Sequence, residues 1–246
     1  MIFALFLREF QSKFNDKFGL SWAFIEPFIF IAVLSFIRGM ISGNDVHSIP
    51  LFIFMMIGLV GLQTLTGNLI SVSMSIRKNK PLYAFRQVLP IAAVITAGFV
   101  ELSIKTVVIA LLALALYLLG DGFKINDPLL LITLYLLLWL FSVSLGLIFA
   151  IAAAFVPEVD KIKSMLTRPL IFISCVFFSL QDMPEYLWPY FTWNPLAHFN
   201  ELARYACFES YGHKGVSLSF TIKVTIVLFF LSLSLYHITW KKVLSR

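Results

Sequence analysis

Charged residues are scarce in this sequence. Asp, Glu, Lys and Arg make up 13% of its 246 residues, whereas a soluble domain carries about a quarter of its residues as charges. Hydrophobic residues account for 60%, and no polar stretch is long enough to build a separate soluble domain. The composition therefore excludes an ordinary soluble enzyme and predicts a single membrane domain over residues 1–246.

Motifs for catalysis and cofactor binding are also missing. The sequence has no G-x-x-x-x-G-K-[ST] nucleotide-binding loop, no H-E-x-x-H metal motif and no G-x-S-x-G nucleophile turn. Its two cysteines, Cys175 and Cys207, have neither metal-ligand nor redox spacing. We therefore expect no enzyme activity, no catalytic residue, no metal site and no cofactor in this chain.

Long apolar stretches are what the sequence does contain. About 20 apolar residues are needed to cross a bilayer as a helix. The pattern predicts an all-α membrane protein with six spans, at residues 22–41, 51–72, 90–119, 129–155, 162–181 and 218–238. The fifth span is the weakest, because its apolar part from Pro169 to Gln181 is too short at about 1.5 Å per residue. To cross the bilayer, this span must include residues 162–168. Otherwise it ends before the opposite membrane surface.

Lys and Arg alternate between the gaps that separate these stretches. Thirteen of them lie in the two ends and in the loops after spans two and four, and three lie in the other gaps. The thirteen are Arg8, Lys13, Lys17, Arg77, Lys78, Lys80, Arg86, Lys161, Lys163, Arg168, Lys241, Lys242 and Arg246. The positive-inside bias then places both termini in the cytoplasm of a bacterial inner-membrane protein, and it explains the net charge of +6 without nucleic acid.

Two segments outside the spans have patterns of their own. In residues 1–20, large apolar residues recur every three or four positions between polar ones, which predicts an amphipathic helix in the membrane interface. This helix could anchor the chain to lipid or bind a cytoplasmic partner, and the sequence leaves both roles open. Residues 182–217 are rich in aromatic residues and proline, and Asn194 before Pro195 predicts a capped short helix. We expect a re-entrant external helical hairpin between spans five and six.

Charged residues that lie in or near the spans include Glu26, Arg38, Glu101, Lys105 and Lys223, and the first four are candidates for the translocation path. A charge at the centre of a membrane helix is costly, so each needs a partner or water. Glu101 and Lys105 are four residues apart and share a helix face. They form either a self-satisfied pair or part of a hydrated translocation path. Arg38 is more simply explained by its reaching to the outer interface.

Four stretches in order are similar to a known family. They are Leu7-Arg8-Glu9 with Gly19-Leu20-Ser21-Trp22 and Glu26-Pro27; Asn79-Lys80-Pro81-Leu82 with Gln87-Val88-Leu89-Pro90-Ile91 and Glu101; Gly146 and Phe155 with Pro157-Glu158-Val159; and Asn194-Pro195-Leu196 with His198, Glu201 and Arg204. The chain resembles the membrane subunit of type-2 ATP-binding-cassette exporters, in the branch that exports capsular polysaccharide. It departs from the family at Ala92, where Asp is common, and at 175–178, where small residues are common.

The resemblance implies a homodimeric permease that moves a lipid-linked polysaccharide, driven by two separate ATPase subunits that bind ATP and Mg. The absence of a nucleotide-binding loop agrees with an external energy source. ATPase-coupling residues would be Arg8, Lys13, Arg77, Lys78, Lys80, Pro81, Leu82, Tyr83, Pro157 and Glu158. Residues 184–213 would form external gate helices, with Trp188, Trp193, His198, Glu201 and Arg204 in the gate.

Two alternatives stay open at this point. The same architecture could export O-antigen, a teichoic-acid-like glycan or a small drug. A different class is an integral-membrane enzyme that modifies a lipid, with His198, Glu201 and Arg204 at the outer face. A periplasmic export partner that binds residues 182–217 is also left open by the sequence.

Overall fold

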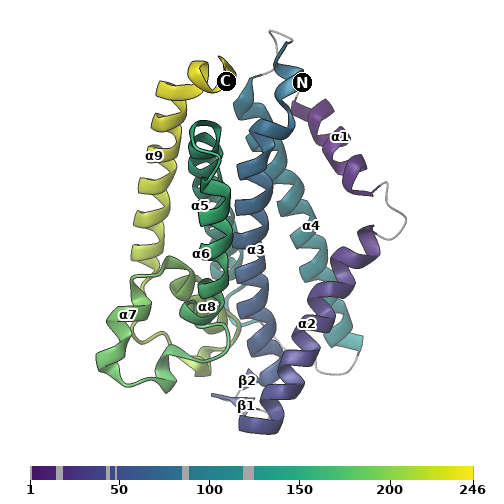
Figure 1. The fold of residues 1–246 in the computed structure, drawn as a ribbon. Helices are drawn as coiled ribbons and strands as arrows, with labels where there is room; N and C mark the ends of the chain where they lie inside the picture. The colour runs from purple at the N-terminus through teal and green to yellow at the C-terminus, as the bar shows by residue number, and fades with distance from the viewer. Residues whose placement is uncertain are drawn as a thin grey trace.

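The computed structural model of the chain describes residues 2–14, 19–42, 45–47, 49–84, 89–118 and 125–245. These residues are almost entirely helical (Figure 1). The α-helices are α1 (Ile2–Phe14), α2 (Gly19–Ser42), α3 (Leu51–Lys78), α4 (Pro90–Leu118), α5 (Pro128–Phe155), α6 (Val159–Ile173), α7 (Trp188–Thr192), α8 (Pro195–Cys207) and α9 (Leu218–Ser245). The 3-10 helices are η1 (Lys80–Ala84), η2 (Leu180–Asp182), η3 (Glu185–Leu187) and η4 (Glu209–Tyr211). Strands β1 (Asp45–Val46) and β2 (Ile49–Pro50) form a short antiparallel hairpin.

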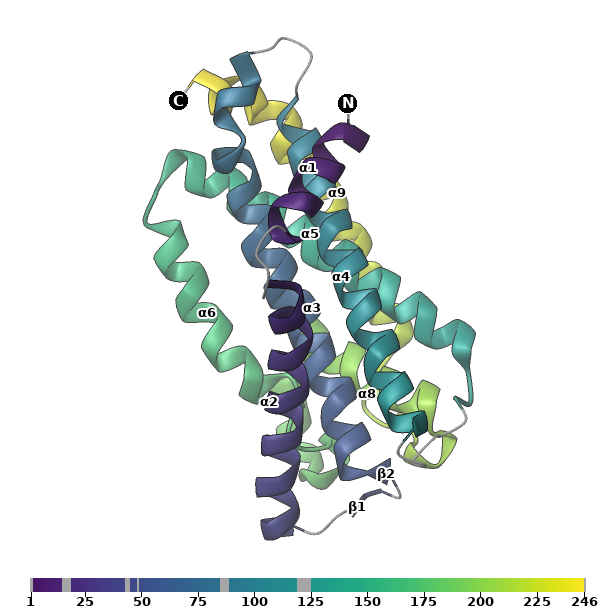
Figure 2. The same ribbon diagram turned by 90° about the vertical axis from the view of Figure 1, so that its right-hand side faces the viewer.

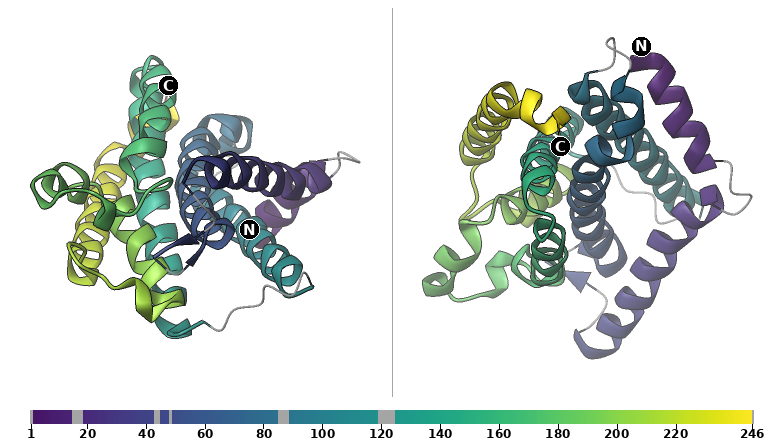
Figure 3. Two further views of the ribbon diagram at one scale, coloured as in Figure 1. Left: turned by 90° about the horizontal axis from the view of Figure 1, so that it is seen from below. Right: turned by 45° about the horizontal axis from the view of Figure 1, so that its top comes forward.

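Helix α3 is the centre of the bundle. It packs against α5 on one side and α4 on another, and α9 covers the far side of α5 (Figures 1 and 3). Gly146 of α5 lets the two central helices approach closely, because a Cβ there would lie 2.7 Å from the Cβ of Val72 on α3. The core therefore depends on a small residue where α3 and α5 cross.

Four of the predicted spans coincide with helices that are long and apolar enough to cross a bilayer. These are α3, α4, α5 and α9. Their bounds lie close to the predicted ones, but α3 and α9 each continue several residues beyond the predicted C-terminal end of the span. Helix α2 covers the first predicted span, and its apolar part among the described residues is the shorter segment Phe28–Met40. The count of six spans stays a prediction.

The fifth predicted span differs from expectation at both ends. Residues 162–181 were expected to be its extent, whereas α6 runs from Val159 to Ile173 and the chain then leaves the helix. Cys175 adopts a left-handed backbone conformation with φ 52°, which a non-glycine residue takes up only when its surroundings hold it there. The helical part of this span therefore ends before Gln181.

Both ends of the chain lie at the same end of the molecule, and the β1–β2 hairpin lies at the opposite end (Figure 1). We refer to these as the terminal end and the far end. Helix α1 packs along α4 at the terminal end, and α6 runs along the side of the bundle opposite α4 (Figure 2). The side of the membrane on which the two termini lie stays a prediction.

The segment between the last two predicted spans folds back on the far end as α7 and α8. Asn194 caps α8 as predicted: its side chain accepts a hydrogen bond from the Leu196 N–H, and Pro195 occupies the first turn. Helix α8 packs against α3, α5 and α9. Its depth in the bilayer, and so the re-entrant character of this hairpin, remains a prediction.

Candidate functional site

An ion-pair cluster joins three elements at the terminal end. We use this name for Arg8, Glu9, Arg77, Lys78, Asp160 and Lys163. Glu9 of α1 is buried and pairs with Lys78 at the end of α3, with Oε2 and Nζ 2.9 Å apart. Arg8 donates a hydrogen bond to the side chain of Asn79, the residue after α3. Two elements that the sequence assigned separately to coupling, the N-terminal helix and the loop after span two, are therefore in direct contact.

Asp160 ties the start of α6 to the same end of α3. Its carboxylate lies 2.9 Å from Arg77 Nη1 and 2.9 Å from Lys163 Nζ. Lys163 is almost completely buried and also donates a hydrogen bond to Ser73 Oγ on α3, at 2.6 Å. The hydrogen bond from Lys163, with the two nearby positive charges, lowers the pKa of Asp160 below its ordinary value. Asp160 therefore stays ionised as the common partner of the two cations.

Helix η1 forms a protruding turn beside this cluster. Lys80 and Pro81 are exposed, and Leu82 and Tyr83 are half-buried. The Tyr83 ring lines a cavity of about 220 Å³ together with Pro157, Ala154 and Val243. Its hydroxyl is buried without a hydrogen-bond partner among the described residues, and this burial raises the pKa of Tyr83. The exposed Lys80 and Pro157, from two predicted coupling segments, also line this cavity.

Two of the charged residues within the spans, Glu101 and Lys105, have described contacts in the structure. Glu101 and Lys105 both lie against Gly67 of α3, as their shared helix face predicts. Ser71 Oγ donates to Glu101 at 2.5 Å, and Lys105 Nζ donates to Gln63 at 3.2 Å. These contacts satisfy both groups inside the α3–α4 interface. Their place on a translocation path stays a prediction.

Arg38 lies at the far end of α2. Its guanidinium is 5.4 Å from the centre of the Phe54 ring, and its Nη1 is buried without a hydrogen-bond partner in the described part of the chain. The backbone of Lys13 and Glu26 is described within α1 and α2, but their side chains are outside the described residues. Their predicted roles in coupling and in the path are therefore untested.

A buried polar network holds the far end together. Arg204 is fully buried, donates to Glu201 Oε1 at 2.8 Å and stacks over Phe54, with its guanidinium carbon 3.5 Å from the ring centre. The Tyr211 hydroxyl lies 2.8 Å from the other oxygen of Glu201 and 2.7 Å from Ser179 Oγ. A buried ion pair is tolerated when its remaining polar atoms are also paired, and these contacts do that for Glu201.

Side chains of α8 and of its N-cap residue donate hydrogen bonds to backbone carbonyl groups where α6 ends. Asn194 Nδ2 donates to the carbonyl of Ile173 at 3.0 Å, and Asn200 Nδ2 donates to that of Ser174 at 2.8 Å. Arg204 Nη2 donates to the carbonyl of Val176 at 3.0 Å. Unpaired carbonyls are very costly in a membrane. This pairing explains how the chain leaves the helix at residues 174–176 without exposing its backbone.

The predicted gate residues are not alike. Trp193 is exposed, and Trp188 is half-buried with its Nε1 donating to the Met183 carbonyl at 2.9 Å. His198 is buried, with Nε2 2.7 Å from the Thr192 carbonyl and Nδ1 accepting from the Ser217 N–H. His198, Glu201 and Arg204 therefore have structural partners. They do not form the exposed acid–base group that a lipid-modifying enzyme would need.

Several residues of these sites were missed by the sequence interpretation. Asp160 and Lys163 are three apart on a helix, which predicts a local pair, but nothing in the sequence indicates Arg77 and Ser73 as their partners. Asn200 and Tyr211 lack any motif. No group of His, Cys, Asp or Glu within the described ranges is arranged to hold a metal ion.

Comparison with known proteins identifies the group to which this architecture belongs. The family model described as ABC-2 type transporter matches residues 1–208. The chain belongs to the ABC-2 type transporter family. The match covers the ion-pair cluster, η1 and all of α8, so of the site residues described above Tyr211, Ser217 and Val243 lie outside the part shared with this family.

Relatives of this ABC-2 type transporter chain include a polysialic acid transport protein and two capsule polysaccharide export inner-membrane proteins. It is 34% identical over 235 residues to the polysialic acid transport protein KpsM of Escherichia coli, covering 95% of this chain and 91% of that protein. It is 24% identical over 209 residues to the capsule polysaccharide export inner-membrane protein BexB of Haemophilus influenzae, covering 85% and 79%. It is 23% identical over 205 residues to CtrC of Neisseria meningitidis serogroup A, with the same description, covering 83% and 77%.

Proposed function

We propose that this chain is the membrane permease subunit of an ATP-binding-cassette exporter of capsular polysaccharide. The observation that carries the proposal is the similarity to KpsM over 95% of the chain, together with the similarity to two named capsule export proteins. The helical bundle, with four helices suited to crossing a bilayer, fits a transporter subunit. The substrate would be a lipid-linked polysaccharide in the bacterial inner membrane, and both termini would be cytoplasmic.

The energy for export would come from a separate ATPase chain that binds ATP and Mg. We place its contact surface at the terminal end, on the exposed Lys80-Pro81 edge, α1 and the Pro157-Glu158 turn. The ion-pair cluster supports this placement, because it makes α1, the end of α3 and the start of α6 one connected unit. A force on any one of these elements would therefore act on all three.

The functional assembly would be a homodimer. Its subunit interface would open toward the far end when the two ATPase subunits come together. The external segment that contains α7 and α8 is the proposed gate, and it is also the surface that a periplasmic partner could bind. Exposed aromatic residues there, Tyr186, Tyr190 and Trp193, suit sugar faces and membrane headgroups alike.

Deletion of the chain in its host tests the function. Capsule should disappear from the cell surface and accumulate inside the cell, and the wild-type chain should restore it.

Replacing Lys80, Pro81 and Leu82 together by Ala should also abolish export while the permease stays in the membrane. Lys223→Ala, which changes an exposed cation on α9 outside the proposed coupling surface and gate, is the control. Unchanged surface capsule after deletion would refute the function, and normal export by the triple variant would refute the coupling surface.

A further inference from the structure

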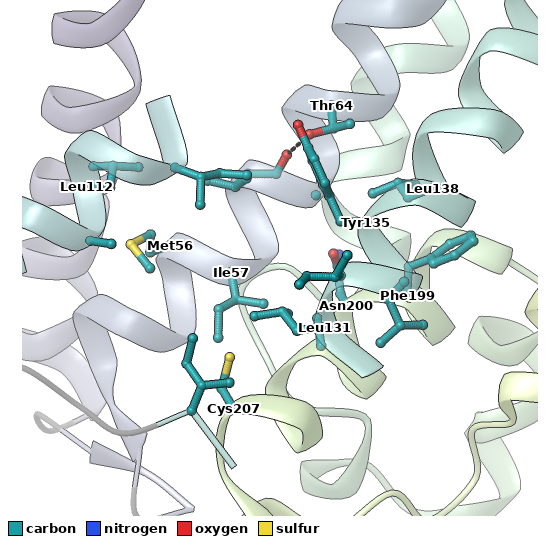
Figure 4. A pocket seen from close by; sticks show the side chains of 18 of the residues that line it. Met56, Ile57, Thr64, Leu112, Leu131, Tyr135, Leu138, Phe199, Asn200 and Cys207 are labelled. Carbon is teal, nitrogen blue, oxygen red and sulfur yellow. Dashed lines mark hydrogen bonds between the residues drawn. The ribbon is translucent and has the colours of Figure 1, made fainter. Parts of the chain in front are cut away.

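An apolar pocket lies in the far half of the molecule, away from the ion-pair cluster. Its volume is about 280 Å³, and it is enclosed by α3, α4, α5 and α8 (Figure 4). The labelled side chains around it include Met56 and Ile57 of α3, Leu112 of α4, Leu131 and Leu138 of α5, and Phe199 of α8. None of the described residues that line it carries a charge.

The polar groups in its wall are already hydrogen-bonded to the protein. Asn200 Nδ2 donates to the Ser174 carbonyl, and Thr64 Oγ1 donates to the Val60 carbonyl at 2.8 Å. The hydroxyls of Thr106 and Tyr135 lie 3.2 Å apart. A buried water needs two to four polar partners, whereas apolar cavities stay dry and accept apolar ligands. The wall chemistry therefore selects hydrocarbon over water.

Helices α4 and α5, which both contribute residues to the lining, cross one another (Figure 2). On the side toward the terminal end the two helices are joined, because Trp139 Nε1 donates to the Gly98 carbonyl at 2.8 Å and Tyr135 donates to that of Leu102 at 3.3 Å. On the rim, Ala113 and Ile132 are exposed. Both helices are long and apolar enough to cross the bilayer, so this exposed rim faces lipid tails.

We propose that this pocket binds one acyl chain of a membrane lipid from the leaflet at the far end. An apolar void loses the dispersion contacts that a hydrocarbon chain would supply, and the surrounding bilayer offers such chains at high concentration. The lining residues of α4 extend from Thr106 to Ala113, about 10 Å along the helix axis, which suits the length of part of a tail. The lipid headgroup lies beyond Ile125, at the far surface. This inference depends on membrane insertion and not on the identity of the exported glycan.

Photo-crosslinking in vesicles tests the pocket. The purified full chain is reconstituted in vesicles of phosphatidylethanolamine and phosphatidylglycerol that contain a phosphatidylcholine with a diazirine in one tail. After illumination, lipid adducts are mapped to peptides. Ala113→Trp places a large ring at the rim to fill the pocket, and Ile132→Trp does so from the opposite rim. Leu114→Trp is the matched control, because Leu114 is 52% exposed on the same helix and does not line the pocket.

We expect adducts to concentrate on the peptides that contain Met56–Val60 and Leu131–Leu138, above the level on the exposed α9 residues Val227 and Phe230. Ala113→Trp and Ile132→Trp should reduce the pocket adducts to the α9 level, and Leu114→Trp should leave them unchanged. Equal labelling of pocket and α9 in the wild type overturns the proposal. So does disulfide dimerisation of an Ile132→Cys variant in the absence of pocket adducts, which would assign the site to a second copy of the chain.

Discussion

The buried ammonium group of Lys163, at the start of α6, lies 2.6 Å from the hydroxyl of Ser73 on α3. Its only charge partner that the described contacts give is Asp160, one turn earlier, which also binds Arg77. The fifth predicted span is thus fixed to the central helix at the point where the ATPase is proposed to act. A buried cation held by one carboxylate makes this link sensitive to a single substitution.

Asp160→Asn should weaken the link without changing its shape. Lys163 would lose its ionic partner, and we expect lower export and a lower thermal unfolding temperature, by roughly 1–3 kcal/mol in unfolding free energy. Capsule export in cells and unfolding of the purified protein in detergent measure the two effects. Lys161→Gln, an exposed cation on the same turn, is the control and should behave as the wild type. An Asp160→Asn variant with wild-type stability would show that Lys163 needs no ionic partner.

The pH dependence of this link follows from the lowered pKa of Asp160. The carboxylate contributes its full stability above its ordinary pKa of 3.8, and that contribution is lost as the pH falls through the lowered pKa in the folded protein. Unfolding temperatures of wild type and Asp160→Asn should therefore differ at neutral pH and converge in strongly acidic solution. A difference that is constant from neutral pH down to about pH 2 would contradict the assignment.

The contact between Glu9 and Lys78 can be tested by exchanging the charges. Lys78 is largely exposed, so the pair itself adds at most about 1 kcal/mol. Its expected effect is on function. Glu9→Lys should reduce export by repulsion from Lys78 and Arg8, and Glu9→Lys combined with Lys78→Glu should restore much of it. Surface capsule and co-purification of the ATPase subunit are the measurements. Equal loss in the single and double variants would show that α1 acts independently of the end of α3.

Arg204 should be the most sensitive residue of the far end. Arg204→Met leaves Glu201 charged and buried, which is expected to cost about 3–5 kcal/mol of unfolding free energy. Arg204→Lys should restore little, because a lysine cannot reach Glu201 and the Val176 carbonyl together as the guanidinium does. Thermal unfolding in detergent measures both.

The double variant Glu201→Gln with Arg204→Met provides the control for this prediction. It removes the isolated charge, so it should be more stable than Arg204→Met alone. If the single and double variants are equally destabilised, packing over Phe54 outweighs the ion pair.

Gly146→Ala should separate the two central helices. The new methyl group would lie 2.7 Å from Val72 Cβ and 3.3 Å from the Asn68 carbonyl, and neither can move without its backbone. A cost of about 1–3 kcal/mol is expected for such overpacking. Gly67→Ala is the control, since its nearest neighbour is the end of the flexible Glu101 side chain at 3.2 Å. Similar unfolding temperatures for both variants would refute the close approach at Gly146.

Much of the bundle was predictable because the bilayer fixes the length of an apolar helix. Helices α4, α5 and α9 begin at or within one residue of their predicted starts. The cap of α8 was predictable because Asn before Pro acts within a few residues. These signals are local, and each is determined by chemistry that neighbouring residues supply.

The end of α6 and the cluster partners were not predictable for the opposite reason. Cys175 takes its left-handed conformation where Asn194 and Asn200, well along the chain, hold the carbonyls just before it. Likewise, Asp160 meets Arg77 only when α3 and α6 pack together. The sequence shows that such side chains carry charge or amide groups, but it does not show which distant group each will meet.

The break after α6 joins this helix to α8 through side chains. The carbonyls of residues 173, 174 and 176 accept hydrogen bonds from side chains of α8 and of its N-cap residue Asn194. Sliding α8 along this stretch would exchange one set of side-chain hydrogen bonds for another, with no helical turn to unwind. A movement of α8 would therefore require these amide and guanidinium groups to find new partners, together with repacking against α3, α5 and α9.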